Sequence, residues 1–267
     1  MTAIVAFVLF IFFQYAAGIA AFLLSGLPMP KTEADVANLQ HQMPAALQGE
    51  CLFVAECILA VGLAIWFVYR RRKAADKLAE GEAVPANRRE PYSEKTRPIR
   101  WWHYLLAIVG LVALGEGVSG IASYFGAASE EDMKIFHDML SSPLCILTIC
   151  LTGPVVEELV FREGIITSIL RFRCPAWIAV LISAALFGYI HGNLTQGIPA
   201  FVVGIPLGFL YLRTMSLRLT IPAHVVNNSL ATLLMAFPVF DDMDMPMALA
   251  IVLVVLGAGL LTLVLKK

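Results

Sequence analysis

A group of charged side chains inside a membrane-length apolar run limits what this chain can fold into. Glu157, Glu158 and Arg162 lie in the middle of residues 143–170, with apolar residues on both sides. Placing a charge at that depth in a bilayer costs several kcal/mol, so charged residues there mark functional sites by default. We therefore expect a functional site around Glu157, with partners supplied by other helices.

The composition places this run in a membrane protein. Of the 267 residues, 59% are hydrophobic and only 15% are charged, whereas soluble domains carry about 25% charged residues. A helix needs about 20 apolar residues to cross a bilayer. We therefore predict an all-α, polytopic membrane protein with about eight transmembrane helices. The predicted spans are Ala3–Leu27, Cys51–Tyr69, Trp101–Phe125, Pro143–Leu170, Ala176–His191, Gly197–Leu212, Leu219–Phe237 and Met247–Leu265.

The basic residues predict how these helices are oriented. With alternating spans, both termini fall on the same side as the connections 70–100, 171–175 and 213–218, and 16 of the 19 lysines and arginines lie on that side. Basic residues gather on the cytoplasmic side of membrane proteins. Both termini are therefore predicted to be cytoplasmic, in a plasma or inner membrane. The net charge of −1 gives no reason to expect a nucleic-acid partner.

One membrane domain accounts for the length of the chain. Residues 1–100 are predicted to form an N-terminal two-helix region with a basic cytoplasmic loop, and residues 101–267 the core that carries the polar cluster. The first apolar run is too long for the hydrophobic region of a signal peptide, so we expect it to be a membrane helix. The five cysteines contain no CxxC pair, and we interpret them as small buried apolar residues rather than disulfides or metal ligands.

Helical periodicity divides the charged cluster into two parts. Glu158 and Arg162 are i and i+4, so they share a face and can neutralise each other. Glu157 is rotated by about 100° to another face and has no such partner. A carboxylate held in a low-dielectric site has the raised proton affinity that a general base requires. The alternative is an ion-pair cluster that only holds helices together.

Two later helices carry polar side chains that fit the same chemistry. His191 ends an apolar span that contains Phe187, and His224 and Asn228 are i and i+4 on a third helix. Taken singly, His191 is as easily a packing residue, and His224 with Asn228 a clamp between helices. Together with Glu157 they make a hydrolytic set: a base, a partner that holds water, and two donors for a developing oxyanion.

Three other chemistries compete for these residues. Glu157, His191 and His224 are enough ligands for a catalytic zinc ion, although the HExxH pattern is absent and no cofactor is otherwise expected. Ser119 lies in a GxSG sequence like the serine motif of rhomboid-type intramembrane proteases, but such small-residue motifs also occur where helices pack closely. A transporter would also place Glu and His in the membrane, and it commonly shows the repeat symmetry that this sequence lacks.

The order and spacing of the motifs resemble a known family. Pro154-x-x-Glu157-Glu158-x-x-Phe161-Arg162, Phe187-x-x-x-His191 and His224-x-x-x-Asn228 are similar to the three motifs of the CAAX protease and bacteriocin-processing family, also called the ABI family. Its members are glutamate-type intramembrane endopeptidases. The sequence Gly204-x-x-x-Gly208-x-x-Tyr211 also fits the family pattern. The resemblance covers residues 153–228 and leaves the first three predicted spans outside.

The resemblance implies a role for each matching residue. Glu157 and His191 would activate the attacking water, His224 and Asn228 would stabilise the oxyanion, and Glu158, Arg162 and Phe187 would support the site. The substrate would be a peptide or a membrane-anchored protein, and the alternative is a non-proteolytic role in bacteriocin immunity or peptide binding. The sequence defines neither an oligomeric state nor a role for three further carboxylates, which are Glu56, Glu116 and Glu163.

The predicted spans conflict with this assignment in one respect. Simple helices would place Glu157 near the middle of the membrane, His191 toward the outer side and His224 toward the cytoplasmic side. The mechanism needs all three together. We therefore expect tilted helices, or a fifth helix whose end lies deeper than its span suggests.

Overall fold

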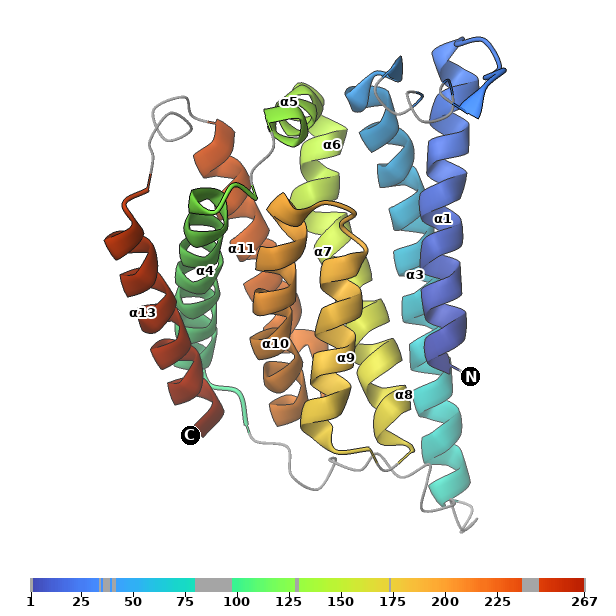
Figure 1. The fold of residues 1–267 in the computed structure, drawn as a ribbon. Helices are drawn as coiled ribbons and strands as arrows, with labels where there is room; N and C mark the ends of the chain where they lie inside the picture. Colours follow the sequence, from blue (N-terminus) through green and yellow to red (C-terminus); the bar gives the residue numbers. More distant parts are fainter. Residues whose placement is uncertain are drawn as a thin grey trace.

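The computed structural model confirms the all-α architecture. It describes residues 2–33, 35, 39, 42–79, 98–127, 130–172, 174–236 and 245–266. The regular structure of these residues is helical and forms a bundle (Figure 1). The helices are α1 (Thr2–Ser25), α3 (Ala45–Ala79), α4 (Trp101–Tyr124), α5 (Glu130–Met139), the continuous run α6 to α8 (Pro143–Leu170), α9 (Ala176–Tyr189), α10 (Leu194–Thr214), α11 (Leu217–Ala236) and α13 (Met247–Lys266).

Each predicted span overlaps one of these helices, although α9 ends at Tyr189 rather than at His191, and the predicted end at Phe237 lies outside the described residues. Among the described residues, six helices are long and apolar enough to cross a membrane. The helix α9 is shorter, with 14 residues. The helix α11 has 20 residues but includes His224 and two asparagines, which make it more polar. The polytopic membrane fold is therefore as predicted, while the number of eight crossings stays a prediction.

The helices form two flanking pairs around a central group. The pair α1 and α3 packs on one side, and α4 packs with α13 on the other, with the run α6 to α8, α9 and α10 between them (Figure 1). Both chain ends lie toward the same end of the bundle (Figure 1), as an even number of crossings requires. The predicted cytoplasmic location of that end remains a prediction, and most of the basic loop 70–100 lies outside the described residues.

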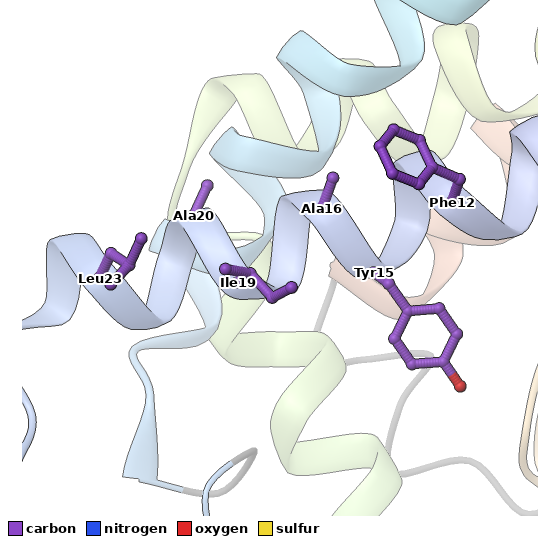
Figure 2. A pocket seen from close by; sticks show the side chains of 6 residues that line it. All are labelled: Phe12, Tyr15, Ala16, Ile19, Ala20 and Leu23. Carbon is purple, nitrogen blue, oxygen red and sulfur yellow. The ribbon is translucent and has the colours of Figure 1, made fainter. Parts of the chain in front are cut away.

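The outer face of α1 is apolar and unusually open for such residues. Phe12, Tyr15, Ile19 and Leu23 are each at least 60% exposed. With Ala16 and Ala20 they line an apolar hollow, formed by this one helix (Figure 2). Large apolar side chains exposed along a 24-residue helix indicate a surface that faces lipid.

The fourth span is a single run in which two stretches are π-helical. These stretches, η2 (Thr148–Thr152) and η3 (Glu158–Ile166), lie on either side of the short α-helical turn α7 (Gly153–Glu157). Pro154 is a physical cause of this irregularity, since it has no N–H to continue the ladder of hydrogen bonds. The sequence predicts the bounds Pro143–Leu170 correctly but not the wide turns, which often occur at functional sites.

Glycines allow α4 and α13 to approach closely. A Cβ atom at Gly257 of α13 would lie 2.6 Å from both the carbonyl oxygen of Gly110 and the backbone nitrogen of Leu114. Small residues at such contacts let helices pack backbone to backbone, which is a main source of attraction between helices in lipid. The α4–α13 pair therefore depends on Gly257 having no side chain.

We expect Gly257→Ala to destabilise the protein by about 1 to 3 kcal/mol, because the added methyl group must push two backbones apart. The matched control is Gly259→Ala on the same helix, where an added Cβ would meet nothing within 4 Å. Thermal unfolding in detergent measures both. Equal melting temperatures for the two variants would contradict the close packing.

Candidate active site

A fully buried ion pair forms the base of the predicted site. The Arg162 Nε atom lies 3.3 Å from Glu158 Oε1, and the side chains of the two residues are 1% and 0% exposed. The same carboxylate oxygen lies 3.1 Å from Nδ1 of His224 on α11. Glu158 therefore holds one cation on its own helix and one ring on another, and the predicted Glu158–Arg162 pairing is present with an additional partner.

Glu157 faces a different direction from Glu158, as the periodicity predicts. Its side chain is 16% exposed, and its Oε2 atom lies 3.6 Å from Nε2 of His224. That separation is longer than a direct hydrogen bond. The His224 ring thus lies between the two glutamates, with Nδ1 toward the buried Glu158 and Nε2 toward the more accessible Glu157. The carboxylate predicted to do the chemistry is the one that substrate or water can reach.

The ring of Phe187 brings the remaining residues together. It makes edge contacts with the rings of His191 and His224, with centroid separations of 5.2 and 5.6 Å. The Arg162 guanidinium lies over the same ring, 4.8 Å from its centroid, which is a cation–π geometry. Phe187 is 2% exposed. Phe187, which was predicted to support the site, therefore provides one ring against which both histidines and the buried arginine pack.

The early end of α9 bears on the conflict of depths in the predicted spans. The helix ends at Tyr189, and Gly192 has a φ of 72° where the chain turns toward α10. A Cβ at Gly188 would lie 2.7 Å from the carbonyl oxygen of Gly197, so α9 and α10 meet closely at this end. His191 therefore follows a short helix and reaches the Phe187 ring, rather than continuing toward the outer surface.

The hydrogen bond of His191 defines which of its nitrogens is available. Its Nδ1 lies 2.8 Å from the carbonyl oxygen of Phe187, and an oxygen acceptor requires Nδ1 to carry the proton. In the neutral ring Nε2 then has a free lone pair. This is the tautomer that can accept a hydrogen bond from a water molecule.

Asn228 is placed by an irregularity in the neighbouring helix. In η2 the Gly153 N–H bonds to the Thr148 carbonyl oxygen, five residues earlier. The next bond of that pattern would run from residue 154 to Ile149, but Pro154 has no N–H. The Asn228 Nδ2 atom donates to the Ile149 carbonyl oxygen instead, at 3.3 Å. The amide therefore compensates for the proline and joins α11 to the turn before Glu157.

Asn227 is a site residue that the sequence analysis missed. Its Nδ2 atom donates to Asn228 Oδ1 at 3.2 Å, and its Oδ1 lies 3.2 Å from the position of a Cβ at Gly115 of α4. It therefore fixes the orientation of the Asn228 amide. The Asn-Asn dipeptide in an apolar helix is the signal that was available in the sequence.

Glu163, which has no assigned role in the sequence analysis, is part of a separate ion pair. Arg71 of α3 donates to both of its carboxylate oxygens, at 3.0 and 2.6 Å. The Tyr211 hydroxyl of α10 donates to Oε2 at 2.8 Å. Glu163 therefore connects three helices, and both of its partners lie outside the run 143–170 that carries it.

The structure also shows where the alternative serine motif packs. A Cβ at Gly117 would lie 2.7 Å from the Ala250 carbonyl oxygen, and one at Gly120 would lie 2.7 Å from Met245 Sδ. Both glycines of the GxSG sequence therefore face the α13 side of α4. This contact supports the interpretation that Ser119 belongs to a helix-packing motif.

No group of three His, Cys, Asp or Glu side chains suited to holding a metal ion occurs in the described part of the chain. His224 lies between two glutamates, and each of its ring nitrogens faces a carboxylate. Zinc dependence stays an alternative to be tested. The cysteines are free thiols, of which Cys145 is buried and the other four are partly buried.

Comparisons with known proteins agree with the motifs. Residues 139–230 match the family model described as "Type II CAAX prenyl endopeptidase Rce1-like". A Bacillus subtilis (strain 168) protein named "Putative membrane peptidase YdiL" is 30% identical over 146 residues. That alignment covers 52% of this chain and 59% of the relative, so the chain spans less than two thirds of the relative's length. No solved structure matches the chain significantly.

The matched segment contains every residue of the predicted site, from Glu157 to Asn228. The motif spacing, the family model and the relative lead to one assignment. Over residues 139–230 the chain is similar to the type II CAAX prenyl endopeptidase Rce1-like family, and both matches support the predicted relationship to the CAAX protease and bacteriocin-processing family.

Proposed function

We propose that this protein is an intramembrane endopeptidase in which Glu157 activates a water molecule. The observation that carries the proposal is the position of the His224 ring between Glu157 and the buried Glu158, at 3.6 and 3.1 Å. One carboxylate fixes the ring and the other is left accessible beside it. A cluster that only joined helices would not need a partly exposed carboxylate just beyond hydrogen-bond distance of a held imidazole.

In this mechanism water is held by Glu157 and by Nε2 of His191. Glu157 removes a proton as the water oxygen bonds to the peptide carbonyl carbon, and the carbonyl oxygen becomes an oxyanion. His224 and the second N–H of the Asn228 amide donate to that oxyanion. The carbon–nitrogen bond then breaks, and Glu157 returns the proton to the leaving amine. No covalent enzyme intermediate forms.

The proposed substrate is a peptide or a membrane-anchored protein, cut at or within the membrane. The family description supports a peptidase, and the placement of the site among apolar helices supports access from the membrane. We place the opening of the site and both termini on the cytoplasmic side, on the basis of the basic connections. Residues 1–100 would form the N-terminal region and residues 101–267 the catalytic core.

The same cleavage assay, run with and without a chelator, tests two alternative functions. A zinc-dependent protease would use Glu157, His191 and His224 as ligands, and its activity would be lost on treatment with a chelator. A protein for bacteriocin immunity or peptide binding would bind a peptide without cutting it. Cleavage that survives the chelator excludes both.

We expect Glu157→Gln to reduce cleavage of a fluorogenic peptide by at least about 100-fold, because the amide cannot accept the proton from water. The melting temperature should stay close to that of the wild type, since Glu157 is not in the buried ion pair. The matched control is Glu116→Gln on α4, another carboxyl group within a membrane helix, which should retain activity. His191→Ala should be as inactive as Glu157→Gln. Full activity in either site variant would exclude the mechanism.

We expect Arg162→Leu to damage the fold as well as activity. It leaves the fully buried Glu158 without its cation, and breaking a buried ion pair from one side costs about 3 to 5 kcal/mol. The double variant Glu158→Gln with Arg162→Leu removes both charges and should recover much of that stability while remaining inactive. Thermal unfolding in detergent measures both effects. An Arg162→Leu protein as stable as the wild type would show that the pair does not support the fold.

A further inference from the structure

A second carboxyl group from the N-terminal helices lies against the turn that carries Glu157. Glu56 is near the middle of the apolar part of α3 and is 4% exposed. It lies outside the matched segment 139–230, and the proposed mechanism does not use it. An ionisable side chain at such a position is costly, so its surroundings must explain it.

The partners of Glu56 are neutral side chains and backbone. The Thr152 hydroxyl donates to its Oε2 atom at 2.7 Å, and the side chain of Gln14 on α1 also forms a hydrogen bond with it. A Cβ at Gly153 would lie 3.7 and 3.8 Å from its two oxygens. Glu56 therefore rests on the start of α7, one helical turn before Glu157.

The charge balance of this contact differs from that of the other carboxylates. Glu158 has Arg162 and His224, and Glu163 has Arg71. Among the described residues, the ionisable group that acts on Glu56 from the helices packed on this part of α3 is another acid, Glu157. Two carboxylates that share a low-dielectric region cannot easily both be ionised, and burial favours the neutral form. Glu56 is the more buried of the two.

We propose that Glu56 is a positioning residue of the catalytic centre. As a neutral carboxylic acid it joins α1 and α3 to the turn of Thr152 and Gly153, and it leaves Glu157 as the single negative charge of the two. It makes and breaks no bond in hydrolysis. This inference rests on the proposed function for its effect on catalysis, but the neutral state of Glu56 is testable without it.

The informative variant is Glu56→Gln, because the amide has the size of a carboxylic acid, can still accept from Thr152 and never ionises. In the wild type, raising the pH ionises Glu56, and a second negative charge beside Glu157 disfavours the oxyanion. We therefore expect the ratio of Glu56→Gln activity to wild-type activity to rise about threefold or more between about pH 7 and about pH 9.5. The KM should stay unchanged, since Glu56 does not contact the substrate.

Stability gives a readout that needs no cleavage. An acid that is neutral when buried binds its proton more tightly in the folded state, so it loses stability relative to glutamine as the pH rises above its value in the unfolded chain. The melting temperature of Glu56→Gln minus that of the wild type should therefore increase by about 3 °C or more between about pH 5 and about pH 8.

Two control variants separate this effect from loss of a helix contact. Glu50→Gln lies on the same helix and likewise accepts from a hydroxyl, that of Ser142 at 3.0 Å, but two turns from Glu56. Thr152→Val removes the donor to Glu56 without changing any charge. Glu50→Gln should give a difference from the wild type that does not vary with pH. Thr152→Val leaves Glu56 ionisable, so it should not reproduce the gain of Glu56→Gln at high pH.

The outcomes distinguish this inference from the proposed function. If the wild type does not cleave peptides, the proposed function fails, and the melting-temperature series still decides the state of Glu56. If the wild type cleaves, a ratio that does not change with pH overturns the positioning role. A melting-temperature difference that is constant with pH shows that Glu56 is not held neutral in the folded protein and overturns the inference. Failure of Glu56→Gln to fold shows that a neutral group of the same size cannot replace Glu56, and it overturns the inference as well.

Discussion

The buried carboxylate of Glu158 is the interaction on which the arrangement of the site depends. A charge with no exposure to solvent must be compensated by nearby partners, because no water is present to do so. Glu158 recruits Arg162 from its own helix and His224 from α11. Arg162 in turn covers the face of Phe187, whose edges meet both histidine rings. The buried charge of Glu158 therefore fixes the relative positions of the run α6 to α8, α9 and α11. Glu157 is not needed for this packing.

Much of this arrangement is predictable from local sequence rules. The i and i+4 spacing identifies Glu158 with Arg162, and the rotation to the next residue identifies Glu157 as the group with a different environment. The bounds of the fourth span follow from its apolar length. The partners across helices are less predictable, because no local rule relates Glu158 to a residue 66 positions later. Likewise, Glu163 is compensated by Arg71 and Tyr211, from helices on either side of it in the sequence.

The π-helical stretches could not be predicted from the sequence, and the reason is physical. Hydrophobic periodicity cannot distinguish an α-helix from a few wider turns, and Pro154 is compatible with several ways of losing a hydrogen bond. The structure shows which carbonyl is affected, since the Asn228 amide donates to Ile149. Asn228 thus depends on the backbone of another helix for its position. Its i and i+4 spacing from His224 on α11 does not by itself reveal that dependence, because both partners of the contact must be seen together.

The carboxylates of this protein are compensated in different ways. The differences indicate which of them can act as a general base. Glu158 and Glu163 are neutralised by arginines and are thereby removed from reaction. Glu56 accepts from neutral groups and is nearly inaccessible. Glu157 is partly exposed and lies just beyond hydrogen-bond distance of a fixed imidazole. A general base must be reachable and must not already be held by a cation. Of these four carboxylates, Glu157 meets both requirements, so its assignment follows from the way the others are compensated as well as from its own surroundings.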